Sequence, residues 1–576
     1  MTWEPGATRL RPAYDGFMPT GAQLFAESLV NLGVDRVFTL VGDHLNEVLA
    51  EIARAGIAVI DMRHESGVTH AADAYARITR HPAIALVTGG PGHTNALTGI
   101  ATAFLACSPL IAVSGSRATT LANREAFQDI DQVAMVRPVV KWAAEASAPQ
   151  QIPFYMERAY AEAASGRQGP VHLTIPIDVF QAQANVSAAR PVVPPDAPAP
   201  DAQRVADAID LLNKSQRPVV IAGSGTWWSG AAAEVQRFIE LTHLPLYTIT
   251  MARGLVRDDH PLCFGYADPA LNRAAKTAFA EADLFLVLGK RIDYRLAFGA
   301  PRVMSAEANV IQVDIHAQEL GLNRKLGVAI HADVRKTLAG LIDAASTKTW
   351  RPLPWLSRLA EFRDTWRAKL KADSAHQSSP LHPAAVYSEI VNALPPQTLL
   401  AWDGGDFTHW GRAILPALNP GGWLRLGPLG TIGSALPNAI ALKLARPDDP
   451  VVMITGDGAL GFYIAEMDTA VRYNLPILFI VGNDAGWGLE RELQNAQGTL
   501  TATGATIACE LRATRYDVVL QGFGGGGENV TSLEQVGPAI TRGLAARKPY
   551  CVNINVRGVR SPFTEWQIEG KQRSHR

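Results

Sequence analysis

Short apolar runs that end in glycine-rich turns recur along this chain, and they restrict the folds open to it. Near the N-terminus, Ala83–Thr88 leads into the turn Gly89–Gly92. A helical pattern follows at Thr94–Ala106, and a second apolar run follows at Leu110–Ser114. Short apolar runs bounded by turns are typical of buried parallel strands, so the pattern predicts a strand–helix–strand unit.

The same order of elements returns near the C-terminus. Val451–Thr455 leads into Gly456–Gly458, a helical pattern covers Tyr463–Tyr473, and Pro476–Val481 is the next apolar run. Strands and helices that alternate in this way form open, doubly wound parallel sheets with right-handed crossovers. Ligands of such sheets bind at the carboxyl ends of the strands, which is where these glycine turns fall.

The chain has 576 residues, more than a single hydrophobic core holds, so we expect several domains. Two joints divide it, the proline-rich Ala189–Asp201 and the polar Lys371–Pro380. Between them, Pro218–Ala222 and Leu284–Leu288 repeat the strand pattern. We therefore predict an α/β protein with three doubly wound parallel-sheet domains and a short C-terminal segment. The predicted ranges are 1–188, 189–375, 376–556 and 557–576.

Charge, hydropathy and cysteine spacing exclude several classes of protein. The formal net charge of -1 gives no basis for expecting a nucleic-acid partner or an anionic membrane surface. No apolar run approaches the roughly 20 residues of a membrane-spanning helix, and the first residues lack the apolar stretch of a signal peptide. The four cysteines are far apart, which favours reduced core residues; they are Cys107, Cys263, Cys509 and Cys551. We expect a cytoplasmic protein.

The stretch from Gly456 to Gly488 carries the clearest chemical signal. Asp457 follows one buried strand, and Asp484 follows the next strand along the chain. Neighbouring parallel strands place their carboxyl ends side by side, so these two carboxylates should converge on one point. Oxygen ligands beside the backbone N–H groups of a glycine turn suit a hard cation and the phosphates that it bridges.

This stretch resembles the diphosphate-binding signature of thiamine-diphosphate enzymes, GDG followed by a pair of asparagines. The resemblance implies that Asp457, Asp484 and the carbonyl of Gly486 bind Mg²⁺. Asn483-Asp484 stands where the family usually has two asparagines, and the extra negative charge is expected to weaken cofactor binding or alter its pH dependence without abolishing the site. Further cofactor-binding residues are implied around this motif and elsewhere; they are Pro91, Gly404, Gly405, Asp406, Gly430, Ile432, Gly456, Gly458, Ala459 and Trp487.

The resemblance extends over the whole chain and assigns roles to three other segments. Glu65 matches the glutamate that hydrogen-bonds the aminopyrimidine ring of the cofactor. The segment 427–433 resembles the pyrimidine clamp, with Ile432 as the wedge where many relatives carry methionine. The first domain is then the pyrimidine-binding domain and the third the diphosphate-binding domain. In this family these two domains meet across a subunit interface, which implies a homodimer or a homotetramer.

Within the family, the sequence is most similar to 2-hydroxyacyl-CoA lyases and oxalyl-CoA decarboxylases. The segment Val313–Gly321 resembles the central domain of that branch, which binds ADP. The contacts implied for ADP are Arg291, Asp314 and Ile315, and a vestigial, empty nucleotide fold is the alternative. The tail Arg557–Arg576 is basic and resembles the C-terminal lid of the lyases over acyl-CoA. A frayed terminus is the alternative for the tail.

Four residues are candidates for the reaction itself. Glu490 lies shortly after the metal motif and could exchange a proton with the substrate's 2-hydroxyl group, or form a surface salt bridge. Gln128 matches the family's glutamine that hydrogen-bonds a substrate oxygen. Phe127 precedes it and should fill space beside the hydroxyl-bearing carbon, which favours aldehydes over ketones; alternatively it points into the core. Together with Glu65 these residues form the predicted catalytic set.

These observations predict a thiamine-diphosphate-dependent carbon–carbon lyase. It would cleave a 2-hydroxyacyl-CoA to formyl-CoA and an aldehyde or ketone, and would also catalyse the reverse carboligation. The partners would be acyl-CoA, formyl-CoA and small carbonyl compounds. The alternatives are an acetolactate-synthase-like carboligase and a 2-keto-acid or oxalyl-CoA decarboxylase. The presence of both Glu65 and Asp457 argues against a catalytically silent binding protein.

Overall fold

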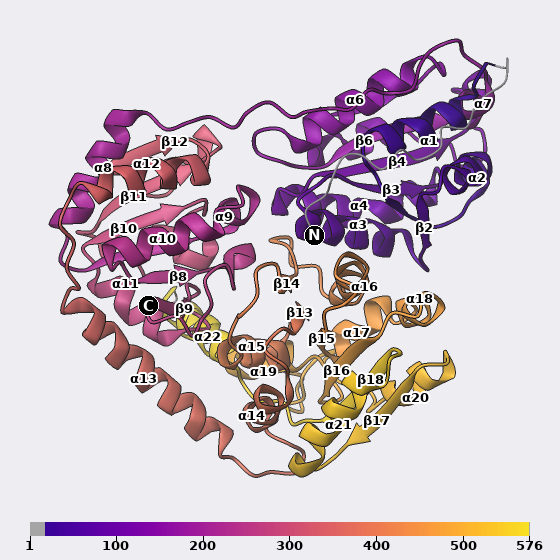
Figure 1. The fold of residues 1–576 in the computed structure, drawn as a ribbon. Helices are drawn as coiled ribbons and strands as arrows, with labels where there is room; N and C mark the ends of the chain where they lie inside the picture. Colours follow the sequence, from indigo (N-terminus) through magenta and orange to yellow (C-terminus); the bar gives the residue numbers. More distant parts are fainter. Residues whose placement is uncertain (1–17, 575–576) are drawn as a thin grey trace. The chain divides into compact units, whose positions relative to one another are not determined.

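The computed structural model describes residues 18–574, with side chains as far as Gly570 (Figure 1). These residues form three six-stranded sheets in which every strand pairs in parallel with its neighbours. The predicted fold class is confirmed. The chain divides into two compact units: the first ends at Pro195, and the second contains Arg77–Arg80 and everything from Asp196 on.

The first unit contains the first sheet, with the strand order β2-β1-β3-β4-β6-β5. Its central strands are buried along their whole length, as expected for parallel strands covered by helices on both faces. The strands are β1 (Arg36–Thr39), β2 (Ala58–Asp61), β3 (Ala83–Val87), β4 (Leu110–Ser116), β5 (Ala143–Glu145) and β6 (Val171–Pro176). The helices are α1 (Gly21–Asn31), α2 (Asn46–Arg54), α3 (Glu65–Thr79), α4 (Pro91–Ala106), α5 (Gln132–Val136), α6 (Gln151–Ala164) and α7 (Ile177–Gln181).

A close contact between α3 and α4 positions the first half of the candidate site. A Cβ atom at Gly99 would lie 2.0 Å from the hydroxyl oxygen of Thr69, so only glycine allows the helices to pack this closely. The Thr69 hydroxyl donates to the carbonyl of Ala96 on the facing helix (3.1 Å). The first turns of both helices, which begin at Glu65 and Pro91, therefore lie at the same edge of the sheet.

The second sheet has the order β12-β11-β10-β7-β8-β9, and the predicted strands Pro218–Ala222 and Leu284–Leu288 are confirmed as β7 and β10. The other strands are β8 (Leu246–Thr248), β9 (Cys263–Tyr266), β11 (Asn309–Asp314) and β12 (Val328–His331). The helices are α8 (Ala202–Lys214), α9 (Ser224–Trp228), α10 (Ala232–Thr242), α11 (Arg273–Glu281), α12 (Val334–Ser346) and α13 (Trp355–Ser374).

The third sheet has the order β14-β13-β15-β16-β18-β17. Its strands are β13 (Leu399–Trp402), β14 (Trp423–Arg425), β15 (Val451–Gly456), β16 (Ile477–Asn483), β17 (Gly526–Val530) and β18 (Tyr550–Asn555). The helices are α14 (Pro383–Ala393), α15 (Asp406–Ile414), α16 (Ala435–Ala445), α17 (Asp457–Leu460), α18 (Glu466–Arg472), α19 (Gly488–Gln497), α20 (Tyr516–Gly522), α21 (Leu533–Ala545) and α22 (Pro562–Ser574).

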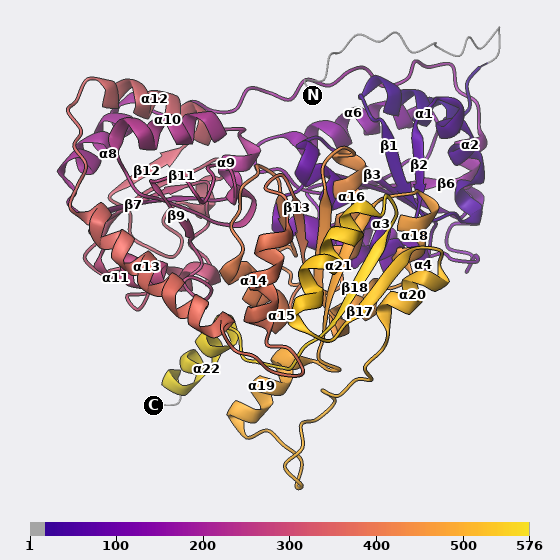
Figure 2. The same cartoon turned by 60° about the horizontal axis from the view of Figure 1, so that its bottom comes forward.

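Two predicted boundaries are wrong. The helix expected at Tyr463–Tyr473 is split, because helical structure starts directly after β15 as α17 and then tightens into a 3-10 turn before α18. The joint expected at Lys371–Pro380 is shorter, because α13 continues to Ser374 and buries Leu370 on the way. In Figure 2, α13 runs along the second unit and leads into α14. The joint Ala189–Asp201 has no regular structure, as expected.

Arg253 joins the edges of the second and third sheets, which belong to the same unit. Its guanidinium makes a bidentate ion pair with Asp258 (2.7 Å for Nη1–Oδ1), and Asp258 also accepts from the backbone N–H of Ala417 (2.8 Å). The guanidinium carbon of Arg253 lies 4.8 Å from the ring centre of Tyr266 and 4.9 Å from that of Trp423. These two rings belong to the edge strands β9 and β14, so the ion pair fixes one sheet against the other.

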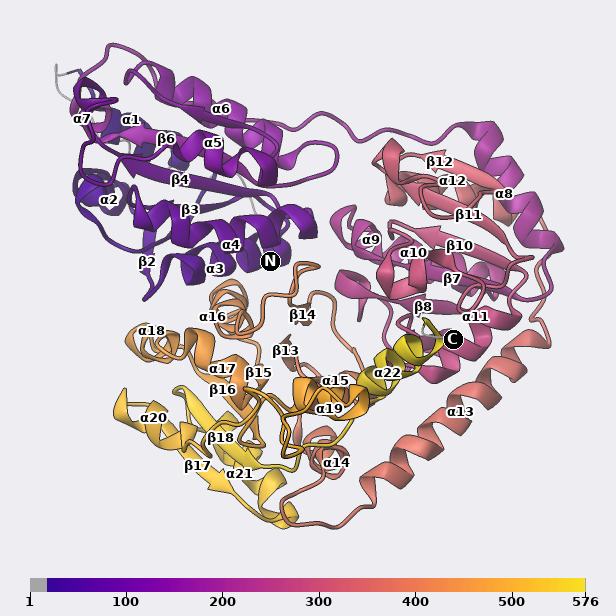
Figure 3. The ribbon, with the colours of Figure 1, turned by 180° about the vertical axis from the view of Figure 1, so that it is seen from behind.

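The C-terminal helix α22 docks on the second unit. Phe563 and Trp566 are half-buried against the core of the central sheet, and Arg273 and Lys276 of α11 lie over the Trp566 ring (5.3 and 5.1 Å). Figure 3 shows α22 beside α15 and α11. A frayed terminus is therefore excluded as far as Gly570, while the side chains of Lys571, Arg573 and Arg576 lie outside the described residues.

Two further expectations agree with the described residues. All four cysteines are free thiols, and three of them are buried. Over residues 18–574, no helix combines the length and the apolar character needed to cross a membrane.

We predict that Arg253→Met destabilises the second unit by about 3–5 kcal/mol, because it leaves the Asp258 carboxylate buried without its partner. The measurement is the midpoint of thermal unfolding. Arg257→Met is the matched control, because the neighbouring Arg257–Asp259 pair is exposed, and we expect it to cost less than about 1 kcal/mol. Equal midpoints for the two variants would contradict the structural role of Arg253.

Candidate active site

Two carboxylates meet at the carboxyl edge of the third sheet. Gly456 of β15 pairs in register with Gly482 of β16, so the residues that follow these strands are neighbours. Asp457 is the first residue of α17 and only 1% exposed, and Asp484 follows the end of β16. Their carboxyl groups are within hydrogen-bonding reach of each other, as predicted from the strand order.

Glycines shape the loop around this pair. The backbone N–H of Gly486 donates to Oδ2 of Asp457 (3.0 Å). A Cβ atom at Gly488 would lie 2.5 Å from Oδ2 of Asp484, and one at Gly458 would lie 2.7 Å from the ring of Trp487. Side chains at these positions would therefore press on the carboxylates and on the Trp487 ring that borders them.

Asn483 holds the loop instead of facing the pair. Its side-chain amide donates to the carbonyl of Thr514 (2.8 Å) and to the side-chain oxygen of Asn553 (3.1 Å). Its own side-chain oxygen accepts from the backbone N–H of Ala485 (3.2 Å). Every polar atom of the Asn483 side chain is used in this way, so the side chain at 484, and not that at 483, faces Asp457.

Burial and like charge dominate the electrostatics of the pair. Burial, and then the negative charge of Asp457, raise the pKa of Asp484 to about 7, although the Arg491 guanidinium at 3.5 Å opposes this. Burial also raises the pKa of Asp457. Two buried carboxylates that repel each other are stabilised by a cation placed between them.

The donor set fits Mg²⁺ and a diphosphate. Two carboxylates and the carbonyl of Gly486 are hard oxygen ligands, and Mg²⁺ bound by one or two carboxylates completes its shell with phosphate oxygens and water. In the part of the chain that the structure describes, no cluster of three or more His, Cys, Asp or Glu side chains could hold a metal alone. A ligand that brings its own oxygens is therefore consistent with this edge of the sheet.

Two further loops lie beside the carboxylate pair, and Asp403 holds them together. The sequence analysis did not identify Asp403. Asp403 follows β13, and its carboxylate accepts from the backbone N–H groups of Gly404 (2.8 Å) and Gly433 (2.9 Å). Burial raises its pKa to about 6. A Cβ atom at Gly404 would lie 2.9 Å from the side chain of Ile432, so these two predicted residues are in contact. The sequence feature that could have identified Asp403 is an aspartate directly after a buried strand, as at Asp457.

Asp406 contacts the tail. Its Oδ1 accepts from the backbone N–H of Ser561 (3.2 Å) and from the hydroxyl of Thr564 (2.5 Å). The residue is buried at the start of α15, and burial raises its pKa to about 6. The sequence placed Asp406 at the cofactor; the structure shows that at least one of its oxygens anchors α22.

Glu65 occupies a protected position in the first unit. It begins α3 and is 8% exposed, and its Oε2 accepts from the side-chain amide of Asn95 on α4 (3.0 Å). A Cβ atom at Gly92 would lie 3.6 Å from its Oε1. Glu65 and the first turn of α4, which begins at Pro91, therefore lie side by side; the contact of Glu65 with the cofactor stays a prediction.

Gln128 lies at the same turn. A Cβ atom at Gly90 would lie 2.8 Å from that of Gln128, which itself has the left-handed backbone angle φ of 60° that non-glycine residues rarely adopt. Phe127 is 85% exposed, so the alternative that it points into the core is wrong. His44 was missed: its Nδ1 lies 2.8 Å from the Thr88 hydroxyl at this turn, and no sequence pattern singled it out.

Glu490 is exposed in the first turn of α19. The neighbouring Arg491, and not Glu490, approaches the carboxylates: it lies 3.5 Å from Asp484 and 3.4 Å from Glu510. The role of Glu490 stays a prediction. Its side chain is accessible to a substrate proton.

The residues implied for ADP converge on the second sheet. Arg291 follows β10, and Asp314 and Ile315 lie at the end of the neighbouring β11. The Asp314 carboxylate accepts from the backbone N–H of His316 (2.9 Å), and all three implied residues are half-buried. The strand order therefore places them at one carboxyl edge.

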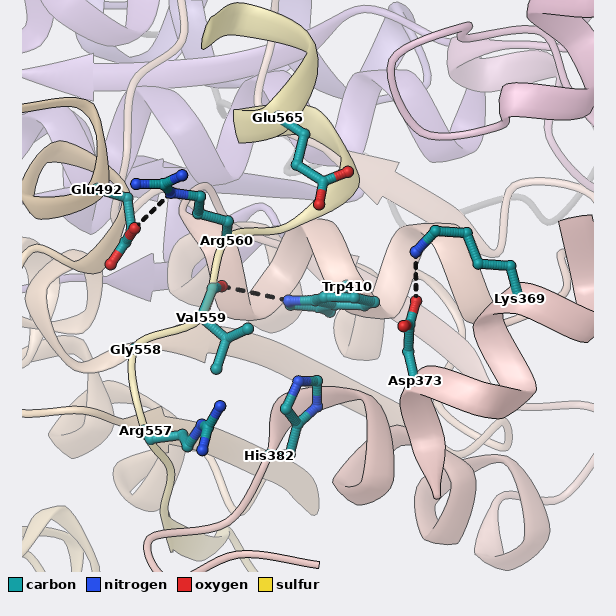
Figure 4. Close-up of a pocket in the computed structure, with 10 residues that line it drawn as sticks. All are labelled: Lys369, Asp373, His382, Trp410, Glu492, Arg557, Gly558, Val559, Arg560 and Glu565. Carbon is teal, nitrogen blue, oxygen red and sulfur yellow. Dashed lines mark hydrogen bonds and ion pairs between the residues drawn. The ribbon is translucent and has the colours of Figure 1, made fainter. Parts of the chain in front are cut away.

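A polar pocket of 340 Å³ lies under the tail segment that precedes α22 (Figure 4). Arg560 on its wall is ion-paired with Glu492 of α19 (2.7 Å), and the ring N–H of Trp410 donates to the carbonyl of Val559 (3.3 Å). Arg557 contributes an exposed guanidinium, and Lys369 is paired with Asp373 (2.9 Å).

Three parallel-sheet domains with a buried pair of carboxylates at one strand edge define an α/β enzyme for a phosphate-bearing cofactor. Comparison with known families gives the class. Models of the N-terminal TPP-binding, central and C-terminal TPP-binding domains of thiamine pyrophosphate enzymes match residues 19–135, 205–341 and 403–554. The chain belongs to this family and is a thiamine-diphosphate-dependent enzyme.

Individual relatives carry two different names. A probable acetolactate synthase from Mycobacterium bovis is 34% identical over 92% of this chain and 95% of its own length. The 2-hydroxyacyl-CoA lyase 2 of Homo sapiens is 32% identical, over 88% of this chain and 84% of its own. The human 2-hydroxyacyl-CoA lyase 1 is 30% identical, over 93% of this chain and 94% of its own length. Proteins related to this chain therefore form or cleave carbon–carbon bonds.

We predict that Asp457→Ala abolishes Mg²⁺-dependent binding of thiamine diphosphate, because a hard cation loses one of its few protein ligands. Asp484→Asn keeps an oxygen ligand and removes one repelling charge, so its affinity should equal or exceed that of the wild type. Calorimetric titration of the cofactor-free protein measures both. Equal loss in the two variants would contradict this interpretation of the loop.

We also predict that Glu65→Gln keeps the fold and the affinity for thiamine diphosphate but loses at least about 100-fold in turnover, because an amide cannot exchange the proton that general acid–base catalysis requires. The measurements are cofactor affinity and initial rate. Asn95→Ala is the companion variant: it removes the hydrogen bond to Glu65 but keeps the carboxyl, so its loss should be smaller. Near-normal turnover of Glu65→Gln would show that Glu65 is not catalytic.

Proposed function

We propose that this enzyme is a 2-hydroxyacyl-CoA lyase. It cleaves a 2-hydroxyacyl-CoA to formyl-CoA and an aldehyde or ketone, and it catalyses the reverse condensation. The observation that carries the proposal is the docked tail, whose first turn is seated on Asp406 and which covers a polar pocket lined by the exposed guanidinium of Arg557. An ordered tail segment that is anchored in this way suits a substrate with a long, phosphate-bearing arm.

The chain's own residues supply three functions at the cofactor. Asp457, Asp484 and Gly486 hold Mg²⁺ and through it the diphosphate. Ile432 supports the cofactor from the side of Gly404. Glu65 holds a proton on the pyrimidine ring. Bound thiamine diphosphate supplies the carbon nucleophile that stabilises negative charge on a carbonyl carbon.

Other residues act on the substrate. Gln128 donates a hydrogen bond to a substrate oxygen from its position beside Gly90. Glu490 takes the proton of the 2-hydroxyl group when the carbon–carbon bond breaks and returns it in condensation. The exposed Phe127 ring borders the hydroxyl-bearing carbon and favours aldehydes over ketones. In addition, Arg291, Asp314 and Ile315 bind ADP, and the protein is a homodimer or homotetramer.

An acetolactate-forming carboligase is the second candidate. It is favoured by the 34% identity to a protein named as a probable acetolactate synthase, which covers nearly the whole of both chains. The two candidates share the cofactor site and differ in the substrate: one uses a coenzyme A thioester and the other a 2-keto acid. The residues that recognise the substrate therefore decide between them.

The direct test supplies the purified enzyme with thiamine diphosphate, Mg²⁺ and a panel of 2-hydroxyacyl-CoAs, and with pyruvate in parallel. We expect formyl-CoA release from the thioesters, measured by chromatography, and no acetolactate from pyruvate. Acetolactate without formyl-CoA would replace the proposal with the second candidate.

Deletion of residues 561–576 tests the tail. We expect a higher KM for the acyl-CoA and lower turnover, because the deletion removes the segment that excludes water from the bound thioester. The affinity for thiamine diphosphate should be unchanged. The double variant Phe563→Ala, Trp566→Ala is the milder companion, since it weakens docking but keeps the segment. Unchanged acyl-CoA kinetics in both would remove the tail from the mechanism.

A further inference from the structure

Three arginines that the cofactor site does not use lie close together inside the second unit. Arg295 follows β10 in the 3-10 segment Tyr294–Gly299, Arg412 belongs to α15, and Arg425 ends β14. The charges of Arg425 and Arg295 act on Arg412, that of Arg295 acts on Arg425, and all three act on Tyr266 at the end of β9. The cluster therefore lies at the carboxyl ends of edge strands from two sheets, which is where α/β folds bind ligands.

Arg412 is the unusual member. The residue is 2% exposed, and among the described residues neither its Nε nor its Nη1 has a hydrogen-bond partner, although both atoms are buried. The Nε of Arg425 is buried without a partner as well. Buried guanidinium groups are normally fully hydrogen-bonded, because an unpaired buried charge is among the most costly features of a fold.

The protein supplies too little negative charge for the cluster. The carboxylate of Asp268 is bound to Arg295 (2.9 Å), and the Tyr266 hydroxyl accepts from Arg425 (3.1 Å). Arg412 donates a hydrogen bond to neither the Asp268 carboxylate nor the Tyr266 hydroxyl. Burial, and then the positive charge of Arg425, lower the pKa of Arg412 to about 9. The cluster thus holds an excess of positive charge.

Arg253 shows how the same fold neutralises a buried arginine when the role is structural. It is as buried as Arg412 and packs on the same Tyr266 ring, but it has a bidentate carboxylate partner in Asp258. The two equally buried arginines therefore differ in one respect: among the described residues, neither the Nε nor the Nη1 of Arg412 has a partner.

We propose that Arg412 and Arg425 bind an oxyanion of the substrate, either a carboxylate or a phosphate. A guanidinium presents two parallel N–H groups that match the oxygens of both groups, and these bonds are strong when desolvated. The proposal deepens the proposed function, on which the choice of coenzyme A as one probe rests.

The tail packs against the helix that carries Arg412. His409, one turn before Arg412 on α15, packs its ring against Phe563 of α22 with the ring centres 4.2 Å apart. His409 is also buried, and its Nδ1 has no partner within residues 18–574. A displacement of α22 would therefore uncover His409, which lies three residues before Arg412 on the same helix.

The test measures binding to the full-length enzyme loaded with thiamine diphosphate and Mg²⁺. The probes are coenzyme A, which carries phosphates, and pyruvate, which carries a carboxylate, each titrated by calorimetry. Arg412→Met removes the charge in a similar volume, and Arg446→Met, on the exposed pair with Asp449, is the matched control. We expect Arg412→Met to weaken binding of one probe about 10- to 100-fold, since it removes charged hydrogen bonds, and the control to bind as the wild type does.

Arg412→Met should also unfold at the same temperature as the wild type or higher, because replacing an unpaired buried charge with an apolar side chain relieves desolvation. Arg412→Lys is the second variant: it keeps the charge and loses the planar fork, so binding should fall by a smaller factor. If Arg412→Met does not fold, Arg412→Lys decides alone.

Each outcome has a definite meaning. Dependence of coenzyme A binding on Arg412 assigns the site to a phosphate, and dependence of pyruvate binding assigns it to a carboxylate. If neither probe binds the wild type, or if both bind the Arg412 variants as tightly as the wild type, the proposal is wrong. Formyl-CoA release is scored separately. Its absence together with Arg412-dependent pyruvate binding overturns only the lyase assignment, and its presence with Arg412-independent binding overturns only this inference.

Discussion

The site depends on one constraint: two buried carboxylates of like charge are held side by side. Parallel pairing of Gly456 with Gly482 forces Asp457 and Asp484 to the same edge. Glycines at 458, 486 and 488 leave the space around them, and Asn483 fixes the loop so that position 484 faces inward. Charge repulsion makes this arrangement unfavourable without a cation. The geometry of the third sheet thus produces a site whose charge favours a bound cation.

Much of the fold follows from local sequence. Pro218–Ala222 and Leu284–Leu288 are predicted to the residue because a buried parallel strand is a continuous apolar run and both neighbours are turns. Boundaries inside helical regions are harder to predict from the sequence. The split between α17 and α18 and the extension of α13 to Ser374 depend on hydrogen bonding and burial that composition alone does not encode.

Some residues of the site can likewise be predicted from the sequence, and others cannot. Asp457, Asp484 and the Glu65 position at a helix start follow from strand ends and from the family motif, and the structure places them as expected within each unit. Asp403 and the contact of Asp406 with Ser561 and Thr564 connect positions far apart in the chain, so only tertiary structure reveals them. The same holds for Arg412, which in the sequence is an ordinary helical arginine.

The comparison between Arg253 and Arg412 separates structural from functional charge inside one unit. A fold that needs a buried arginine for stability provides a carboxylate for it, as Asp258 does. A fold that keeps one without a partner accepts a desolvation cost that packing does not repay, so the compensation comes from something that binds. Relatives named acetolactate synthase and 2-hydroxyacyl-CoA lyase match this chain almost equally well, at 34% and 32% identity. The two proposed reactions use a 2-keto acid and a coenzyme A thioester. Both kinds of substrate carry an oxyanion, but at different distances from the reacting carbon. The separation between the arginine cluster and the cofactor pocket is therefore the physical quantity that distinguishes the two reactions.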